Sequence, residues 1–352
     1  MPSLINNYKI SIIDIAVNHS YFNKNNKLEQ ITLTAINNGI LPVFVGLNEE
    51  TSKSAVENAE KYGCYCYVGI HPNDVISDQI TFNEDFFTSL ISNTKQVIAI
   101  GECGLDYYRI KQTLIQTNID TGIDKSIKET NINTNKQNNN INKSIKETNN
   151  NTNKQNTNTN KQNTNKQNNN TNKQTTNNNI KQSLRKQTLM QIEIFRKQLL
   201  FGKKLKLPFF LHLRDLEGSN EAFIEFIKLI NEVGGIKGVI HSFDGSIDNA
   251  LKLIEMGFFI GINGCSMKND LEMVKHIPIE KILIETDSPF CMIRKKYKAA
   301  EYVQLIKAKE NKPEFVSNIL EAVSKIKNID IEELKERILQ NTIECFNINI
   351  KH

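Results

Sequence analysis

The feature that most constrains this chain is a repeated alternation of short apolar runs with polar or helical stretches. Runs of this length that alternate with helices predict βαβ units and a parallel sheet. Eight such units fit a closed (β/α)₈ barrel better than the alternative, an open doubly wound sheet. The eight runs are Ile10–Val17, Ile40–Gly46, Cys64–Ile70, Val97–Gly101, Leu207–Leu211, Gly238–Ile240, Phe258–Ile262 and Lys281–Ile284. Helical spacing is clearest over 27–37, 184–204, 221–233, 313–327 and 331–346.

One segment does not match this alternation. Lys111–Ser183 consists mostly of Asn, Gln, Thr and Lys and repeats the hexapeptide SIKETN. Such a tract buries too little apolar surface to offset the entropy cost of ordering, so we predict a disordered insert after the fourth strand. The other 279 of the 352 residues are close to the roughly 250 of a typical barrel. We therefore predict one barrel domain in two parts, 9–110 and 184–350, interrupted by 111–183.

The insert also accounts for the basic character of the chain. It carries 11 Lys against 4 Asp or Glu, whereas the net charge of the whole chain is only +5. Charge alone is therefore no sign of nucleic-acid binding. A basic arm that grips a phosphate backbone is an alternative role for the insert, but it lacks the aromatic residues that such arms interleave with charge.

Terminal and cysteine patterns indicate the compartment. The N-terminal sequence has no basic and apolar leader, and no apolar run approaches the roughly 20 residues of a membrane span. The six scattered cysteines indicate free thiols in a reducing environment. We expect an intracellular protein of the cytoplasm or nucleus, with no membrane association and no obligate protein partner.

Potential metal ligands follow several apolar runs directly or closely. Because parallel strands end on the same side of a barrel, these side chains are expected to meet there. Taken singly, each histidine is as easily explained by a structural role. Together they form the imidazole and carboxylate donor set of hydrolytic Zn²⁺, Mn²⁺ or Mg²⁺ sites, in which bound water becomes a nucleophile. The candidates are His71, Glu102, His212, His241 and Asp287.

The segments around these candidates resemble a known family. Their sequences are GIHP at 69–72, GECGLDY at 101–107, FLHLRD at 210–215, IHSFDGS at 240–246 and IETDSPF at 284–290. All five resemble motifs of the TatD-type metal-dependent deoxyribonucleases, which belong to the amidohydrolase-like metal-dependent hydrolases. The resemblance extends from Ile12 to about Phe346, where NTIECF also matches the family's last helix.

This resemblance implies a (β/α)₈ barrel that hydrolyses DNA phosphodiesters with a divalent metal, including 3′–5′ exonucleolytic trimming. It implies Glu102, His212, His241 and Asp287 as metal ligands, with Asp287 also the base for the attacking water. His71 is expected to contact the scissile phosphate. Mg²⁺ is the expected ion, with Zn²⁺ or Mn²⁺ as alternatives, at one or two ions per chain.

The residues beside these candidates receive lesser roles. We expect Asp106, Asp215 and Asp244 to be structural, Asp244 as a helix cap in FDGSID. Arg214 is expected to bind phosphate or to brace the site.

The first strand departs from the common family pattern. Many members carry a His-x-His pair where this chain has Ala16 and Asn18. We therefore expect one firmly held ion, with any second ion bound weakly through the Asn18 amide or with substrate. Two other functions remain open at this point: hydrolysis of a small amide or ester, and a catalytically impaired barrel that binds nucleic acid or protein.

Overall fold

A computed structural model describes residues 9–75, 77, 79–110, 112, 163–216 and 218–349, with 163–181 described by their backbone only. The chain divides into two compact units, Met1–Tyr108 with Leu189–His352 and Arg109–Thr188. Residues 111 and 113–162 of the predicted insert lie outside the described residues, and their disorder stays a prediction, whereas residues 163–183 are helical and not disordered as predicted.

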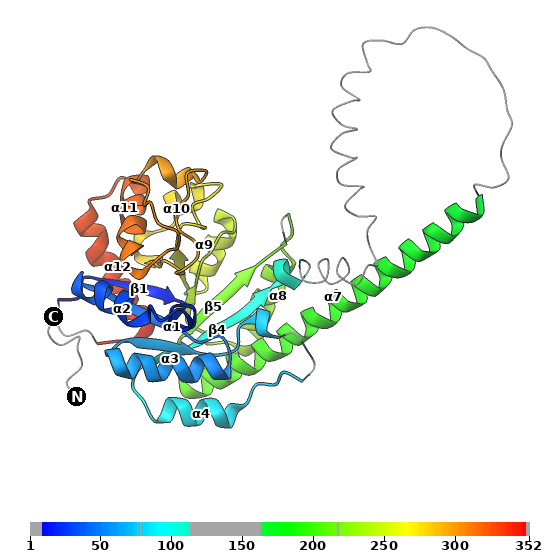
Figure 1. Cartoon of the computed structure of the whole chain (residues 1–352), viewed down its shortest axis with the longest axis horizontal. Helices are drawn as coiled ribbons and strands as arrows, with labels where there is room; N and C mark the ends of the chain where they lie inside the picture. Colours follow the sequence, from blue (N-terminus) through cyan, green and yellow to red (C-terminus); the bar gives the residue numbers. More distant parts are fainter. Residues whose placement is uncertain are drawn as a thin grey trace, which may run out of the picture. The chain divides into compact units, whose positions relative to one another are not determined.

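The first unit is built on eight strands, all parallel, in the order β1 to β8. The predicted barrel is confirmed (Figure 1). All residues of most strands are buried, as expected where helices cover the outer face of a parallel sheet. This double burial explains why the strands appear in the sequence as continuous apolar runs. The strands are β1 Ile12–Val17, β2 Ile40–Val45, β3 Tyr65–Val68, β4 Val97–Asp106, β5 Phe209–Arg214, β6 Gly238–Ile240, β7 Phe259–Ile262 and β8 Ile282–Ile284.

The last and first strands meet at a seam held by few contacts. A single parallel bridge joins Val17 to Ser288. The buried carboxylate of Asp14 accepts hydrogen bonds from the backbone N–H and the hydroxyl of Thr286, at 2.8 and 2.6 Å. A side chain therefore supplies part of the pairing that closes the barrel between β1 and β8.

Helices surround the strands of this unit (Figure 1). Their termini follow local chemistry, as in α3, where Asn48 and Thr51 form a reciprocal capping box and Gly63 ends the helix at φ +75°. The longer helices are α2 Leu28–Asn37, α3 Glu49–Tyr62, α4 Glu84–Ser92, α7 Asn163–Leu205, α8 Glu221–Val233, α9 Ile247–Glu255, α11 Val316–Lys327 and α12 Ile331–Phe346. The shorter ones are α1 His19–Lys24, η2 Pro72–Asp74, α10 Glu272–His276, η3 Ile279–Lys281, η4 Lys298–Glu301 and η5 Pro313–Phe315.

Helix α7 begins earlier than its apolar spacing predicts. The sequence predicts a helix from residue 184, whereas α7 begins at Asn163. Its C-terminal part is fixed by the buried side chains of Ile194, Phe195 and Leu199. Once such turns exist, each further residue gains a hydrogen bond without a new nucleation cost, so the helix extends into a tract that lacks Gly and Pro.

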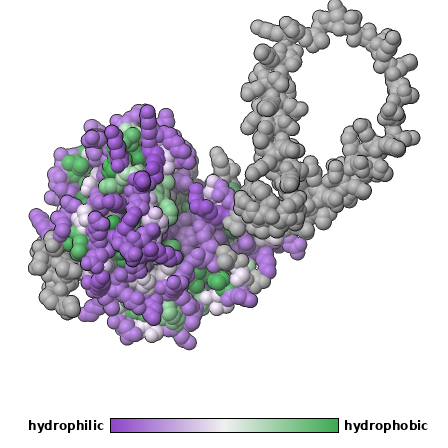
Figure 2. Space-filling model, in the orientation of Figure 1, coloured by the Kyte–Doolittle hydropathy of each residue, from purple (hydrophilic) through white to green (hydrophobic). Residues whose placement is uncertain are grey.

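The surface of the barrel unit is mostly hydrophilic on the face shown in Figure 2, with small separate apolar areas. Within the described residues, none of the helices has the length and apolarity that a membrane crossing requires. All six cysteines are free, as expected.

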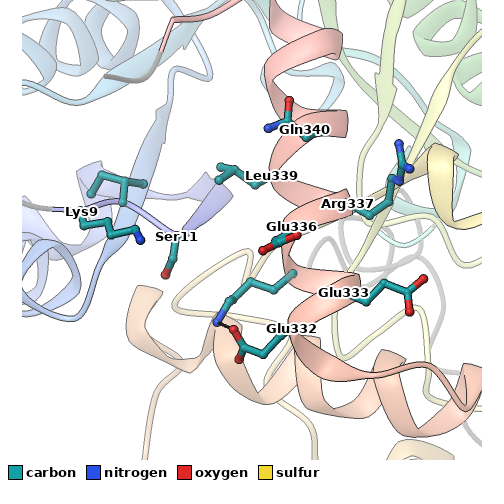
Figure 3. A pocket seen from close by; sticks show the side chains of 10 residues that line it. Lys9, Ser11, Glu332, Glu333, Glu336, Arg337, Leu339 and Gln340 are labelled. Carbon is teal, nitrogen blue, oxygen red and sulfur yellow. Dashed lines mark ion pairs between the residues drawn. The ribbon is translucent and has the colours of Figure 1, made fainter. Parts of the chain in front are cut away.

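A charged hollow of about 590 Å³ lies between the residues before β1 and helix α12 (Figure 3). Lys9 and Ser11 contribute to one side, and α12 contributes Glu336, Arg337 and an ion pair of Lys335 with Glu332. Because it adjoins the N-terminal end of β1, this hollow is at the opposite end of the barrel from the residues that follow the strands.

Candidate active site

Glu102 and His212 lie side by side on two adjacent strands. Glycines on both sides of Glu102 let β4 approach β5 closely. A Cβ on Gly101 would stand 2.2 Å from the Phe210 carbonyl oxygen, and one on Gly104 would stand 1.9 Å from that of His212. Both glycines have φ angles near +150°, which other residues rarely adopt. Replacing either glycine would separate the strands and displace Glu102 from His212.

Both residues lie within strands, which differs from the sequence-based expectation that they follow strand ends. Strand β4 continues to Asp106, and β5 continues to Arg214. The apolar side chains end before these strands do. Backbone pairing, such as that of Gly104 with His212, continues beyond the last apolar residue of each run. His71, His241 and Asp287 do follow their strands.

Three imidazoles converge on one oxygen of Glu102. Its Oε1 lies 3.0 Å from His71 Nε2, 2.9 Å from His212 Nδ1 and 2.7 Å from His241 Nε2. His212 Nδ1 and His241 Nε2 are themselves 3.1 Å apart. Candidate ligand atoms of His71, Glu102 and His212 all fall within 4.8 Å of one another. The residues predicted from four different strands thus meet at one point.

The other nitrogen of His212 and of His241 faces a carboxylate. His212 Nε2 lies 3.2 Å from Asp106 Oδ2, and His241 Nδ1 lies 3.4 Å from Glu285 Oε1. A neutral ring would carry its proton on the carboxylate side and direct His212 Nδ1 or His241 Nε2 at the Glu102 oxygen as an acceptor. Burial lowers the pKa of His212, but its hydrogen bonds to Asp106 and Glu102 outweigh burial and raise the pKa to about 9. Glu102 and Glu285 likewise outweigh burial and hold the pKa of His241 well above its usual range. A carboxylate behind each histidine is typical of metal-binding histidines.

His71 has the opposite arrangement. Its Nδ1 accepts a hydrogen bond from the backbone N–H of Asn73 at 3.0 Å. A neutral His71 ring therefore carries its proton on Nε2, and this N–H donates to Glu102. His71 is thus built to donate a hydrogen bond, whereas His212 and His241 can offer lone pairs.

Helix α7 holds this part of the site in place. Its Gln198 side chain makes two hydrogen bonds to the backbone of Ile70, at 2.7 and 3.0 Å. The Gln191 side chain accepts from the N–H of Asp106 and donates to the carbonyl of Pro72, both at 3.0 Å. Two buried glutamines therefore fix the segments on both sides of His71 and the strand that carries Asp106.

Asp287 is held by side chains from both sides of the seam between β1 and β8. The Asn18 amide donates to Asp287 Oδ1 at 2.9 Å and to the Ser288 carbonyl at 3.2 Å, while the Cys291 thiol donates to Asp287 Oδ2 at 3.3 Å. Since both of its partners are acceptors, the nitrogen of the Asn18 amide must face them. Among the described residues, Asp287 is not part of the group of potential ligands that lie within 4.8 Å of one another.

Burial and charge set the protonation of these groups. Burial opposes ionisation of Glu102, but the nearby His241 and His71 outweigh it and hold the pKa of Glu102 well below its usual range. Burial raises the pKa of Asp287 to about 6, with the negative charges of Glu102 and Glu285 adding to the shift and His241 opposing it. Asp287 thus exchanges a proton near neutral pH, as a general base should.

The converging donors fit a divalent cation. His212 Nδ1 and His241 Nε2 lie 3.1 Å apart beside the Glu102 carboxylate, so positive charge is favoured between them. A divalent cation can supply that charge in place of the ring protons, with the carboxylate oxygen as an anionic donor. Two imidazoles and a carboxylate are a standard ligand set for Zn²⁺ and related ions in hydrolytic enzymes.

The sequence-based predictions missed two members of this site. Asp106 and Glu285 were expected to be structural or were given no role, yet they orient His212 and His241. Their only sequence signal is an acidic residue within the same motif as a candidate ligand.

The remaining predicted residues have simpler contacts. Asp215 was expected to form a structural salt bridge. Its carboxylate instead accepts the backbone N–H groups of Ala222 and Phe223 at the start of α8, which is also a structural role. The prediction that Asp244 caps the next helix is wrong, because the Ser246 side chain caps α9 and accepts the backbone N–H of Asn249. Arg214 stacks over the Tyr108 ring at 4.1 Å.

The fold and this centre define a metal-dependent hydrolase on a (β/α)₈ barrel. A family model described as TatD related DNase matches residues 13–120 and 179–347. A TATDN1 homolog of Enterocytozoon bieneusi is 34% identical over 345 residues, which are 96% of each chain. The 3′-5′ ssDNA/RNA exonuclease TatD of Klebsiella pneumoniae is 24% identical over 315 residues, covering 88% of this chain and 87% of that one.

Solved structures agree on the fold. A hydrolase TatD family protein from Entamoeba histolytica superposes with a TM-score of 0.67 at 21% identity, covering 96% of this chain and 99% of that one. The chain belongs to the TatD related DNase family. The predicted family, fold and enzyme class, a hydrolase of ester bonds, are confirmed.

Proposed function

We propose that this protein is a deoxyribonuclease that removes nucleotides from the 3′ end of DNA, with a divalent ion held by Glu102, His212 and His241. The observation that carries the proposal is the meeting of the Glu102 oxygen with one nitrogen of His212 and one of His241, each ring having a carboxylate at its other nitrogen. Family membership supports phosphodiester cleavage, and the name of the Klebsiella relative supports the direction.

The ion supplies a water molecule of lowered pKa and offsets negative charge on the phosphate oxygens. We propose Mg²⁺ as the working ion because phosphate chemistry favours a hard cation. Zn²⁺ and Mn²⁺ also match imidazole donors, so they belong in the same assay. Asp287 is proposed as a further ligand of this ion or of one that arrives with substrate.

The surrounding residues perform the proton transfers and the positioning. Asp287, with its pKa near 6, accepts the proton of the attacking water. The Nε2–H of His71 donates to a non-bridging phosphate oxygen, in place of its hydrogen bond to Glu102. Asp106 and Glu285 keep the histidine rings oriented, and Arg214 is available for a neighbouring phosphate.

The first strand supports a single firmly bound ion. Ala16 offers no donor, and the amide nitrogen of Asn18 is bound to Asp287 and Ser288, so only the neutral amide oxygen remains as a weak ligand. Asn18 thus positions Asp287. We therefore propose one tight ion per chain.

The test is cleavage of oligonucleotides labelled at the 5′ or the 3′ end, with Mg²⁺, Mn²⁺, Zn²⁺ or EDTA. We expect the wild-type protein to shorten the DNA from its 3′ end only with metal, and Glu102→Gln to lose nearly all activity while remaining folded by circular dichroism. Glu272→Gln, an exposed change on α10, is the matched control and should keep full activity. Cleavage of p-nitrophenyl esters or anilides with no loss of DNA would refute the proposal in favour of a small-substrate hydrolase.

A further inference from the structure

We propose that Tyr21 and Phe290 form a stacking surface for an unpaired nucleobase of the substrate, beside Asp287. This inference rests on the proposed nuclease function and adds a base-binding subsite to it. The structure places two exposed aromatic rings together on segments that are hydrogen-bonded to Asn18 and Asp287.

Tyr21 and Phe290 differ from the other aromatic residues in their exposure to solvent. Tyr21 is 37% exposed and Phe290 is 56% exposed, and they are the two aromatic residues among the exposed large apolar side chains of the described chain. Their ring centroids are 6.4 Å apart at an interplanar angle of 59°. An exposed aromatic surface is costly in water, and bases of every type can stack on it.

Both rings are attached to the segments that hold Asp287. The backbone N–H of Tyr21 donates to the Asn18 carbonyl at 3.1 Å, and the Asn18 side chain donates to Asp287. The backbone N–H of Phe290 donates to the Asp287 carbonyl at 2.9 Å. The aromatic pair and the proposed general base are therefore parts of one hydrogen-bonded unit across the seam of β1 and β8.

The Tyr21 side chain and the Phe290 backbone are held by neighbouring residues. Tyr21 packs edge-on against the buried Phe22 at 5.3 Å, and its hydroxyl donates to Glu310 at 3.1 Å. The carbonyl of Phe290 accepts from the buried Asn311 side chain at 2.7 Å. A surface that is ordered before the ligand arrives loses little conformational entropy on binding.

A basic segment lies within reach of this surface. Arg294, Lys295 and Lys296 are exposed and begin four residues after Phe290, which is at most about 14 Å along the chain. Stacked bases next to cations that follow the backbone are the features of single-strand binding sites. Apolar protein partners would not require this combination, so we favour a nucleobase as the occupant.

The deciding experiment compares oligonucleotides that carry a base or an abasic site at each of the three 3′-terminal positions. In the wild-type protein, the abasic site at the stacked position should lower kcat/KM by about 5- to 150-fold, the range for losing one stacked base. In the double variant Tyr21→Leu with Phe290→Leu, which keeps apolar bulk but removes both rings, normal and abasic DNA should differ by less than twofold. Phe290→Tyr in place of Phe290→Leu should restore part of the discrimination.

A direct binding measurement uses the absence of tryptophan from this chain. In a Phe290→Trp variant that also carries Glu102→Gln, the single indole should be quenched by normal single-stranded DNA and much less by the abasic form. An Ile224→Trp protein, with an equally exposed site on α8, should respond to neither.

The outcomes separate this inference from the proposed function. Cleavage of DNA by the wild-type protein with no dependence on terminal bases, or a double variant that discriminates like wild type, would overturn the stacking surface and leave the nuclease intact. Failure of the wild-type protein to cleave any DNA would overturn both.

Discussion

Acid should destabilise this protein through His19, the first residue of α1, which directly follows Asn18. The His19 side chain is fully buried. Its Nδ1–H donates to the Val45 carbonyl at 3.2 Å, whereas its Nε2 has no hydrogen-bond partner. Its ring packs against Phe44. A second proton on Nε2 would therefore enter an apolar environment with no acceptor.

The size of the effect follows from the pKa. Burial lowers the pKa of His19 to about 4, with the Val45 hydrogen bond opposing the shift, against about 6.5 in the unfolded chain. Between these values the unfolded state binds one more proton, so the free energy of unfolding decreases as pH falls. The expected loss is roughly 1 kcal/mol at pH 5.5 and approaches about 3 kcal/mol near pH 4.

The assay is urea unfolding at pH 7.5 and pH 5.5, followed by circular dichroism. His19→Asn keeps a donor for the Val45 carbonyl but does not titrate. Its free energy of unfolding should therefore fall by roughly 1 kcal/mol less than that of wild type over this interval. His276→Asn, at an exposed histidine of α10, should lose as much stability as wild type. Equal losses for His19→Asn and wild type would refute the reasoning, because contributions of other residues cancel in this comparison.

Three further predictions concern the metal centre. Asp106→Asn should weaken binding of Mn²⁺, measured by calorimetry, by about 10- to 100-fold because His212 loses its orienting carboxylate. Asp215→Asn, which affects the start of α8, should leave binding unchanged. An equal effect of both variants would contradict the role of Asp106 in orienting His212. His71→Asn should keep the metal affinity within about threefold but lower DNA cleavage at least tenfold, because we propose that His71 donates a hydrogen bond to the phosphate. A large loss of metal affinity in this variant would instead make His71 a metal ligand. Elemental analysis after dialysis against Zn²⁺ should give one ion per chain. Two tightly bound ions per chain would mean that Ala16 and Asn18 do not prevent binding of a second ion.

Much of this protein is determined by the sequence itself. The apolar runs give the strands because residues buried on both faces of a parallel sheet must be apolar at every position. The parallel arrangement then places His71, His241 and Asp287 at one end of the barrel, since parallel strands all end there. Five motifs that occur in the same order as in the family also identify the family from the sequence.

Only the tertiary structure indicates the role of each residue in the site. Whether a histidine donates or accepts depends on what its other nitrogen meets, and those partners come from other strands or from the backbone: Asp106 for His212, Glu285 for His241, and the N–H of Asn73 for His71. The meeting of Asn18 with Asp287 across 269 residues of sequence likewise depends on the closure of the barrel. Proton placement is a property of contacts between elements, so the local pattern indicates that ligands are present while the packing decides which of them can bind an ion.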